Sequence, residues 1–302
     1  MILKKRSLKP GFLFCISLCL MVGIFQPIHS SSQPRILVDI SHSHENANTE
    51  INFTMLPVQL SQFTFEISDE RLTPSLLEEY QVLLFYQPYA VLDDSEIEAV
   101  TAFIEKGGGV LMCGDHYLGW ERESIASYNK LISQFGISFT PTVVDDPTNK
   151  QGCTCTPIIH NLEEHSITEN ISQIVLYSPC NLIVSGDAQP LARGDEDTIM
   201  KGNTKTSGNV QGEDIIVAAV SEYGSGRIVA IGSYTLLTNS LVNEPDNLLF
   251  VEHCILWASE HSASTGDRSQ WYIPVAVGVI VCGLLIAVYG FKKREKSTSE
   301  KK

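Results

Sequence analysis

FIEKGGGVLMCGD, residues 103–115, is the stretch that decides the predicted fold of this chain. Its first residues end an amphipathic helix, the three glycines stop that helix, and VLMC forms a short buried strand. In an open parallel α/β sheet, ligands bind just beyond the carboxyl ends of the strands. The Cys-Gly-Asp-His run at 113–116 therefore stands where a functional site is expected. The role of Cys113 decides between an enzyme and a binding module.

Strands and helices alternate on both sides of this stretch. Apolar runs predict strands at 35–41, 63–67, 82–86, 110–113, 137–139, 174–177, 181–184, 215–220 and 227–231. Asp93 or Asp94 caps a helix before the glycines, and 247–259 predicts a closing helix. The polar run 194–212 predicts an irregular insert. This alternation predicts one α/β domain with a doubly wound, mostly parallel, flavodoxin-like sheet.

Several segments resemble the class I glutamine amidotransferase-like superfamily. They are DDSEIEAVTAFIEKGGGVLMCGD, HSITENISQIVLYSPCNL, PLARGDEDT and the run from 215 to 258. The similarity is greatest to its non-enzymatic DUF4350 branch. Relatives there include gliding-motility-type ABC transporter auxiliary proteins and the N-terminal domain of an intraflagellar transport subunit. The features typical of such domains fall here on Gly224, Gly226, Arg227, Asn239, Asn247 and Trp257. The resemblance covers residues 34–260 and implies an amidotransferase-like fold.

The resemblance also bears on catalysis. Amidotransferases carry a cysteine nucleophile on a sharp elbow after this strand, with a later histidine as base. Counting from the first glycine of the turn, the elbow position is Gly114, so Cys113 comes one residue early. A shift of one residue turns a strand side chain to the opposite face. We therefore expect a core cysteine and no enzyme. The alternative is a hydrolase or amidotransferase that uses Cys113 with His116 or His160.

Polar residues follow three of the predicted strands at their carboxyl ends. They are Asp39, His42 and His44 after the first strand, Gln87 after the third, and Asp115 and His116 after the fourth. Because these loops converge in a doubly wound fold, the set predicts a ligand-binding site. Its side chains suit a polar ligand such as a sugar, or a divalent metal. The competing interpretation is that they cap helices or face solvent. No cofactor is otherwise expected.

Two acidic runs lie in the later half of the chain. Asp145-Asp146 and Asp195-Glu196-Asp197 lack the alternating ligand spacing of an EF-hand loop. We expect them to be solvated loop charges.

Five cysteines lie between residues 31 and 270. Cys153 and Cys155 are spaced too tightly for a metal knuckle, so a disulfide from one of them to Cys180 is the candidate pairing. Asn52 and Asn170 begin glycosylation sequons.

The two ends of the chain predict its location. Residues 1–30 combine a basic leader with an apolar run, which is typical of a signal peptide or an uncleaved signal anchor. Residues 271–291 carry no charge and are long enough for a transmembrane helix after a polar stalk at 261–270. The basic tail 292–302 predicts a cytoplasmic end, because positive residues stay inside. The domain at 31–260 is then extracellular on a single-pass cell-membrane protein.

Charge constrains the partners of this domain. The chain holds 21 basic and 35 acidic residues; the leader takes 4 basic ones, and the tail takes 6 basic and 2 acidic. The 11 basic and 33 acidic residues that remain repel nucleic acid. The sequence therefore predicts a membrane-anchored binding or scaffolding module. Its expected partners are the lipid bilayer, through the helix, and another cell-surface or transporter protein. Alternatives are the Cys113 enzyme and a carbohydrate or metal sensor that uses Asp115 and His116.

Overall fold

The computed structural model describes residues 33–43, 52–116, 122–202 and 210–260. The predicted leader, stalk, transmembrane helix and tail lie outside these ranges, and so does His44. Within the described ranges, no helix is both long and apolar enough to cross a membrane.

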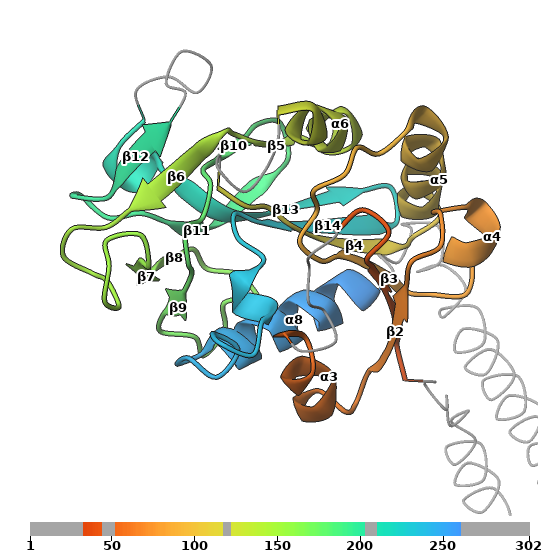
Figure 1. Cartoon of the computed structure of the whole chain (residues 1–302), viewed down its shortest axis with the longest axis horizontal. Coiled ribbons are helices and arrows are strands. Elements are labelled where there is room, and N and C mark those ends of the chain that lie inside the picture. The colour runs from red at the N-terminus through yellow and green to blue at the C-terminus, as the bar shows by residue number, and fades with distance from the viewer. Residues whose placement is uncertain (1–32, 44–51, 117–121, 203–209, 261–302) are drawn as a thin grey trace, which may run out of the picture. The chain divides into compact units, whose positions relative to one another are not determined.

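A sheet of eight strands forms the centre of the domain (Figure 1). Its order is β2-β1-β3-β4-β14-β13-β11-β8. The strands are β1 (Arg35–Asp39), β2 (Thr64–Ser68), β3 (Val82–Phe85), β4 (Gly109–Cys113), β8 (Asn161–Leu162), β11 (Gln189–Arg193), β13 (Ile216–Tyr223) and β14 (Gly226–Ile231). The strands from β2 to β14 are parallel, whereas β13, β11 and β8 join antiparallel. The mostly parallel α/β sheet expected from the sequence is present.

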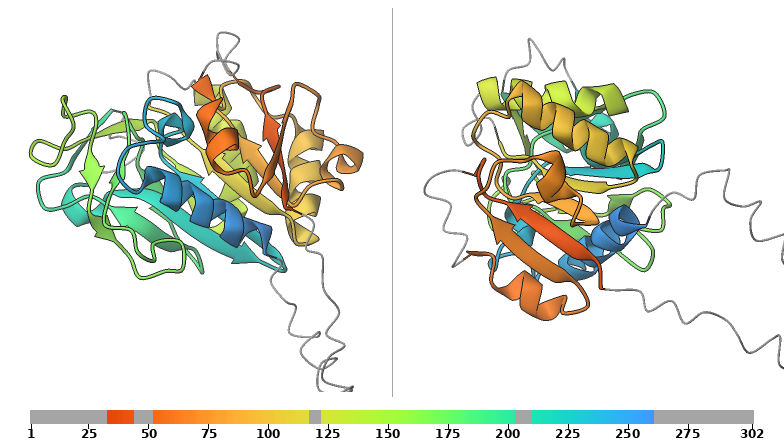
Figure 2. Two further views of the ribbon diagram at one scale, coloured as in Figure 1. Left: turned by 90° about the horizontal axis from the view of Figure 1, so that it is seen from below. Right: turned by 90° about the vertical axis from the view of Figure 1, so that its right-hand side faces the viewer.

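Helices cover both faces of this sheet (Figure 2). One face carries α5 (Asp94–Glu105) and α6 (Arg122–Ile132), and the other carries α8 (Asn247–Ser259) and the short α3 (Met55–Gln59). The short α4 (Pro74–Leu77) packs beside α5. Three 3-10 turns complete the helical segments: η1 (Ser133–Phe135), η2 (Gly212–Asp214) and η3 (Thr235–Leu237). The architecture is therefore a three-layer α/β/α domain.

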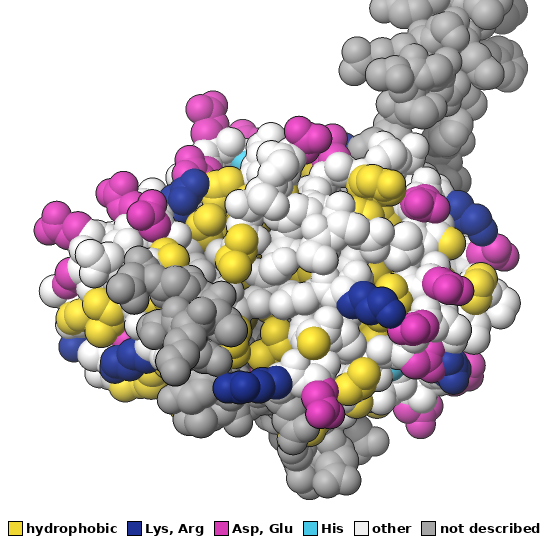
Figure 3. All heavy atoms as spheres, turned by 90° about the horizontal axis from the view of Figure 1, so that it is seen from above, with side chains coloured by type: hydrophobic (Ala, Val, Ile, Leu, Met, Phe, Trp, Pro, Cys, Tyr) yellow, Lys and Arg dark blue, Asp and Glu magenta, His cyan; other side chains and the backbone are white. Residues whose placement is uncertain are grey.

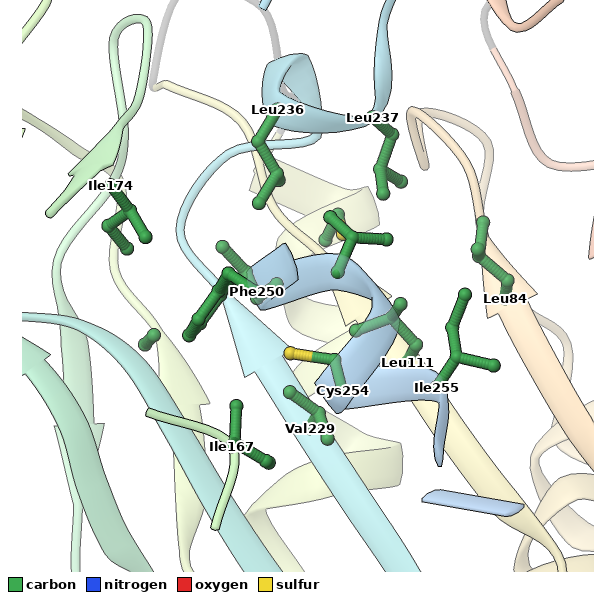
Figure 4. Close-up of a cluster of buried hydrophobic side chains, with 14 of the residues drawn as sticks. Leu84, Leu111, Ile167, Ile174, Val229, Leu236, Leu237, Phe250, Cys254 and Ile255 are labelled. Atoms are coloured by element: carbon green, nitrogen blue, oxygen red, sulfur yellow. The ribbon is translucent and has the colours of Figure 1, made fainter. Parts of the chain in front are cut away.

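Strand side chains alternate between the two helical layers, as the pleat requires. Val110 and Met112 of β4 lie in the core with α5 and α6. Leu111 and Cys113 lie in the core with α8. Figure 4 shows this second core, in which Cys254 and neighbouring α8 side chains face the strands. Full burial of one such aliphatic side chain stabilises the fold by roughly 1.5–3 kcal/mol.

Glycines allow two helix ends to approach the sheet backbone. A Cβ on Gly109 would lie 2.1 Å from the carbonyl oxygen of Ala258 at the end of α8. A Cβ on Gly226 would lie 2.0 Å from the carbonyl oxygen of Ile104 in α5. No side chain fits at either distance. These two contacts explain why glycine stands at position 109, the last of the three glycines before β4, and at position 226, just before Arg227.

A capping box fixes the start of α5. The Asp93 side chain accepts hydrogen bonds from the backbone nitrogens of Ser95 and Glu96, at 2.9 and 3.0 Å. The Glu96 side chain accepts one in return from the Asp93 nitrogen, at 3.2 Å. Such a box satisfies backbone donors that a helix start leaves open. Of the two aspartates predicted to cap this helix, Asp93 is the cap.

Three small two-stranded sheets in the described residues show strands or strand partners that the sequence did not predict. The strands β6 (Thr142–Asp145) and β12 (Ile199–Gly202) pair, so part of the predicted irregular insert is a strand. The strands β5 (Ile137–Phe139) and β10 (Leu182–Val184) pair, as do β7 (Ile158–Ile159) and β9 (Ile174–Val175). The predicted strands at 174–177 and 181–184 therefore pair with distant partners and not with each other. Local periodicity identifies strands but carries no information on non-local pairing.

Candidate functional site

Gly114 stands at the elbow position after β4, and the space that a side chain would need there is already occupied. The Gly114 nitrogen donates to the Ile231 oxygen at 2.7 Å, and the Gly114 oxygen accepts from Tyr234 at 2.9 Å. A Cβ on Gly114 would lie 2.9 Å from the Phe139 ring and 3.0 Å from the Cys180 sulfur. Both neighbours are buried. A nucleophile has no room at the place where amidotransferases carry one.

Cys113 lies on the opposite face, as its register predicts. It is fully buried in the α8 core, and burial raises the pKa of its thiol. Among the described residues, the two histidines proposed as a base have other surroundings. The His116 ring is hydrogen-bonded to Asp115, and His160 is exposed between β7 and β8. Cys113 therefore has the environment of an unreactive core thiol.

Asp115 and His116 form a pair at the exit of β4. The Asp115 Oδ1 accepts hydrogen bonds from the His116 nitrogen and from His116 Nδ1, both at 2.7 Å. This bond to Asp115 raises the pKa of His116, against the opposing effect of burial. The bond also orients the ring, so a metal or ligand would be bound through Nε2. Asp115 is 7% exposed, whereas His116 is half-buried and reaches the surface.

Tyr234 lies next to this pair, since its nitrogen donates to the oxygen of Gly114, the residue before Asp115, at 2.9 Å. Burial raises the pKa of Tyr234 to about 12, with further contributions from Asp115 and Tyr177. The rings of Tyr234 and Tyr86 meet edge to face, with 5.7 Å between their centroids. Tyr177 is 48% exposed. A carboxylate, an imidazole and one tyrosine, Tyr234, thus lie near one another, which is chemistry that suits a polar ligand with an apolar face.

Asp39 and His42 are enclosed and do not line this site. The His42 Nδ1 lies 2.8 Å from Asp39 Oδ2, and its Nε2 lies 3.2 Å from Glu96 Oε2. All three residues are at most 5% exposed. Burial opposes protonation of His42, yet Asp39 and Glu96 together raise its pKa. Asp39 and His42 were predicted as ligand residues; the structure buries them in an ion-pair network instead.

Glu96 is the member of this network that the sequence prediction missed. Its position in the capping box three residues after Asp93 was the available signal. No local pattern shows that a helix-cap glutamate also faces a histidine 54 residues away. Gln87, another predicted site residue, has φ 50° at the exit of β3, a conformation that non-glycine residues adopt rarely. The structure describes no contact of Gln87 with the Asp115 pair.

Three carboxylates come together elsewhere. Asp146, Asp195 and Asp197 each offer an oxygen within 4.8 Å of the others. Burial works against the ionised form of Asp195, but hydrogen bonds from Asn149 and Thr198 lower its pKa. The sequence prediction treated these residues as separate solvated charges. The structure groups them, and oxygen ligands of this kind suit a divalent cation.

The disulfide prediction is wrong in its pairing. Cys153 is bonded to Cys155, and Cys180 is a free, fully buried thiol. Cys180 cannot serve as the partner because its sulfur packs against Gly114 under the sheet, whereas Cys153 lies in an exposed loop. Asn52 and Asn170 of the two sequons are both exposed, so glycosylation stays a prediction.

The residues that carried the family resemblance hold the α8 layer in place. The Asn247 amide bonds both backbone groups of Val175, at 2.8 and 2.9 Å, and the Leu241 oxygen at 2.8 Å. Arg227 lies over the Trp257 ring, 4.9 Å from its centroid. The Asn239 side chain accepts a hydrogen bond from the Met55 nitrogen at 2.9 Å, which ties the segment after η3 to α3. Their roles are structural.

Comparison with known proteins gives information only on the fold of this chain. No protein-family model matches the chain, and no curated protein does. Among solved structures, the mmIFT52 N-terminal domain is similar at 15% identity, with a TM-score of 0.61 over 74% of this chain and 97% of that domain. A ThuA-like protein from Parabacteroides merdae has 11% identity and a TM-score of 0.49 over 76% of this chain and 90% of its own. The first similarity shows a shared fold and no more; the amidotransferase-like assignment and membership of the DUF4350 branch stay predictions.

Proposed function

We propose that the chain is a binding or scaffolding module, held on the outer face of the cell membrane, whose amidotransferase-like fold lacks the catalytic cysteine. One observation carries the proposal: the space at the Gly114 elbow is occupied by Phe139 and Cys180. Cys113, one residue earlier, is buried beneath α8. The fold is therefore used for its surface loops and not for acyl transfer.

The described surface supports this use. On the face drawn in Figure 3, few charged side chains lie over the middle, and acidic side chains gather towards both ends. Tyr177 and Ile183 are 48% and 47% exposed, among the larger apolar side chains that reach solvent. Aromatic residues amid polar neighbours are typical of protein interfaces. The acidic side chains would repel an anionic partner, so we propose a protein partner.

A glutamine-analogue chloroketone tests the enzyme alternative. The full-length chain is incubated with this affinity label and digested, and the Cys113 peptide is analysed by mass spectrometry. We expect no adduct on Cys113 in the folded protein, because the thiol is buried and protonated. A stoichiometric adduct that glutamine suppresses would replace the binding module with an amidotransferase.

A ligand sensor at Asp115 and His116 is the second candidate. It is favoured by the oriented carboxylate–histidine pair next to Tyr234. Calorimetric titration with Zn²⁺ and with simple sugars tests it, with Asp115→Asn as the variant. We expect binding that weakens about tenfold or more in this variant, since the carboxylate orients the histidine. Equal binding by both proteins, or none by either, removes the sensor candidate.

A further inference from the structure

The loop between β6 and β7, whose course can be followed in Figure 1, carries a disulfide between Cys153 and Cys155 that spans a single residue. Cys153 is exposed and Cys155 is half-buried. A cross-link stabilises a fold by restricting the unfolded chain, and this effect falls as the closed loop shortens. A bridge across Thr154 alone therefore adds little stability. Accessible disulfides that contribute little to the fold are those that take part in exchange.

Backbone hydrogen bonds hold this loop independently of the sulfur bond. The Gln151 nitrogen donates to the Thr156 oxygen at 2.9 Å, and the Thr156 nitrogen donates to the Cys153 oxygen at 3.0 Å. The Ser178 nitrogen donates to the Cys155 oxygen at 2.6 Å. The two sulfurs therefore stay adjacent when the bond opens. Such positioning makes reclosure effectively intramolecular and fast.

Thr156 provides a hydrogen bond to one of the two sulfurs. Its Oγ1 lies 3.4 Å from Cys153 Sγ, and the residue is only 7% exposed. A disulfide sulfur carries no proton, so the hydroxyl is the donor. The same bond favours the thiolate once the disulfide opens. Cys153 is thus the sulfur that a substrate can reach. It is also the better-stabilised thiolate in a later step that releases it.

We propose that Cys153 and Cys155 form a thiol–disulfide exchange site that oxidises dithiols. A substrate thiolate attacks Cys153 Sγ, the Cys153–Cys155 bond breaks, and Cys155 leaves as a thiolate that takes up a proton. The second substrate thiolate attacks the substrate sulfur of the mixed disulfide and displaces Cys153, whose thiolate accepts the Thr156 hydrogen bond. The substrate loses two electrons and becomes a disulfide, and the protein pair gains them. A second disulfide compound restores the pair by the reverse steps.

Native-state reduction of the full-length chain tests the site. One arm uses dithiothreitol and the other a peptide with a reduced Cys-x-x-Cys pair. The state of Cys153 and Cys155 is read by alkylation and mass spectrometry, and near-ultraviolet circular dichroism reports the fold. We expect one equivalent of oxidised dithiol per chain with unchanged dichroism. In the Cys155→Ser variant, where Cys153 is a free thiol, we expect a mixed disulfide on Cys153 when the same peptide is supplied in its oxidised form, with one peptide cysteine released as a thiol. Reduction that occurs only when the protein unfolds would make the bond a structural cross-link and overturn the proposal.

A matched pair of threonine variants tests the hydrogen bond. Thr156→Val removes the hydroxyl that contacts Cys153, and we expect exchange to slow roughly threefold to tenfold, because a poorer leaving thiolate departs more slowly. Thr154→Val is the control, since its hydroxyl bonds Asp145 at 3.2 Å and not a sulfur. Thr156→Ser, which keeps the hydroxyl, should restore the rate. Equal rates in the two valine variants would contradict the assigned role of Thr156.

Discussion

At the scale of single residues, Gly114 matters most to the proposed function. Its missing side chain leaves the space that the Phe139 ring and the Cys180 sulfur occupy. Gly114→Ala adds a methyl group to a packed core, which typically costs about 1–3 kcal/mol. We expect this loss in the free energy of unfolding, measured with urea. Phe139→Leu, made in the Gly114→Ala background, should recover part of it; fully additive effects would show that the two positions do not compete for space.

Asn247 is the second residue on which the structure depends. Its buried amide satisfies two backbone groups of Val175 and one of Leu241, in the manner of a neighbouring strand. Asn247→Ala leaves these groups buried and unpaired, so we expect a loss of about 2–4 kcal/mol. Urea unfolding measures it. Ser259→Ala, at the half-buried last residue of the same helix, is the control; it removes only a hydrogen bond from the Ser259 hydroxyl to the Leu256 oxygen and should change stability much less.

At the scale of elements, the buried network joins the exit of β1 to the start of α5. Its His42 has a raised pKa in the folded protein. A raised folded pKa means that the stabilisation is complete below about pH 6.5, the ordinary value for histidine, and is lost as the pH rises through the folded value. We expect the free energy of unfolding to fall across that interval, and to fall less in His42→Gln. Identical pH profiles for both proteins would rule out a charged His42 between Asp39 and Glu96.

The same scale shows how far the sequence could predict the structure. Helix α8 was predicted at its observed bounds, and the strands of the parallel half within a few residues, because apolar periodicity and capping signals are local. The partners of β5, β9 and β12 were not predictable, since they come from distant parts of the chain. The candidate site likewise has features that the sequence could predict and features that it could not. The register of Cys113 was predictable, whereas the burial of His42 against Glu96 required the fold.

At the scale of the whole molecule, the predicted anchor gives the binding module its orientation. Limited proteolysis of intact cells should cut the polar stalk at 261–270 and release the folded domain. The basic tail should stay protected, because it is predicted to be cytoplasmic. Antibodies against the domain and against the tail follow the two fragments. A tail that is digested while the membrane is intact would contradict this orientation.

The central claim is that the fold places Cys113 in the core beneath α8 and leaves no nucleophile at the elbow. Pulsed alkylation of Cys113 across a urea series, read by mass spectrometry, tests it most directly. We predict that the labelling rate at zero urea is far below that of the unfolded chain, and that it rises only along the global unfolding curve. Rapid labelling at zero urea, at a rate that urea leaves unchanged, would show an exposed reactive thiol and contradict the account.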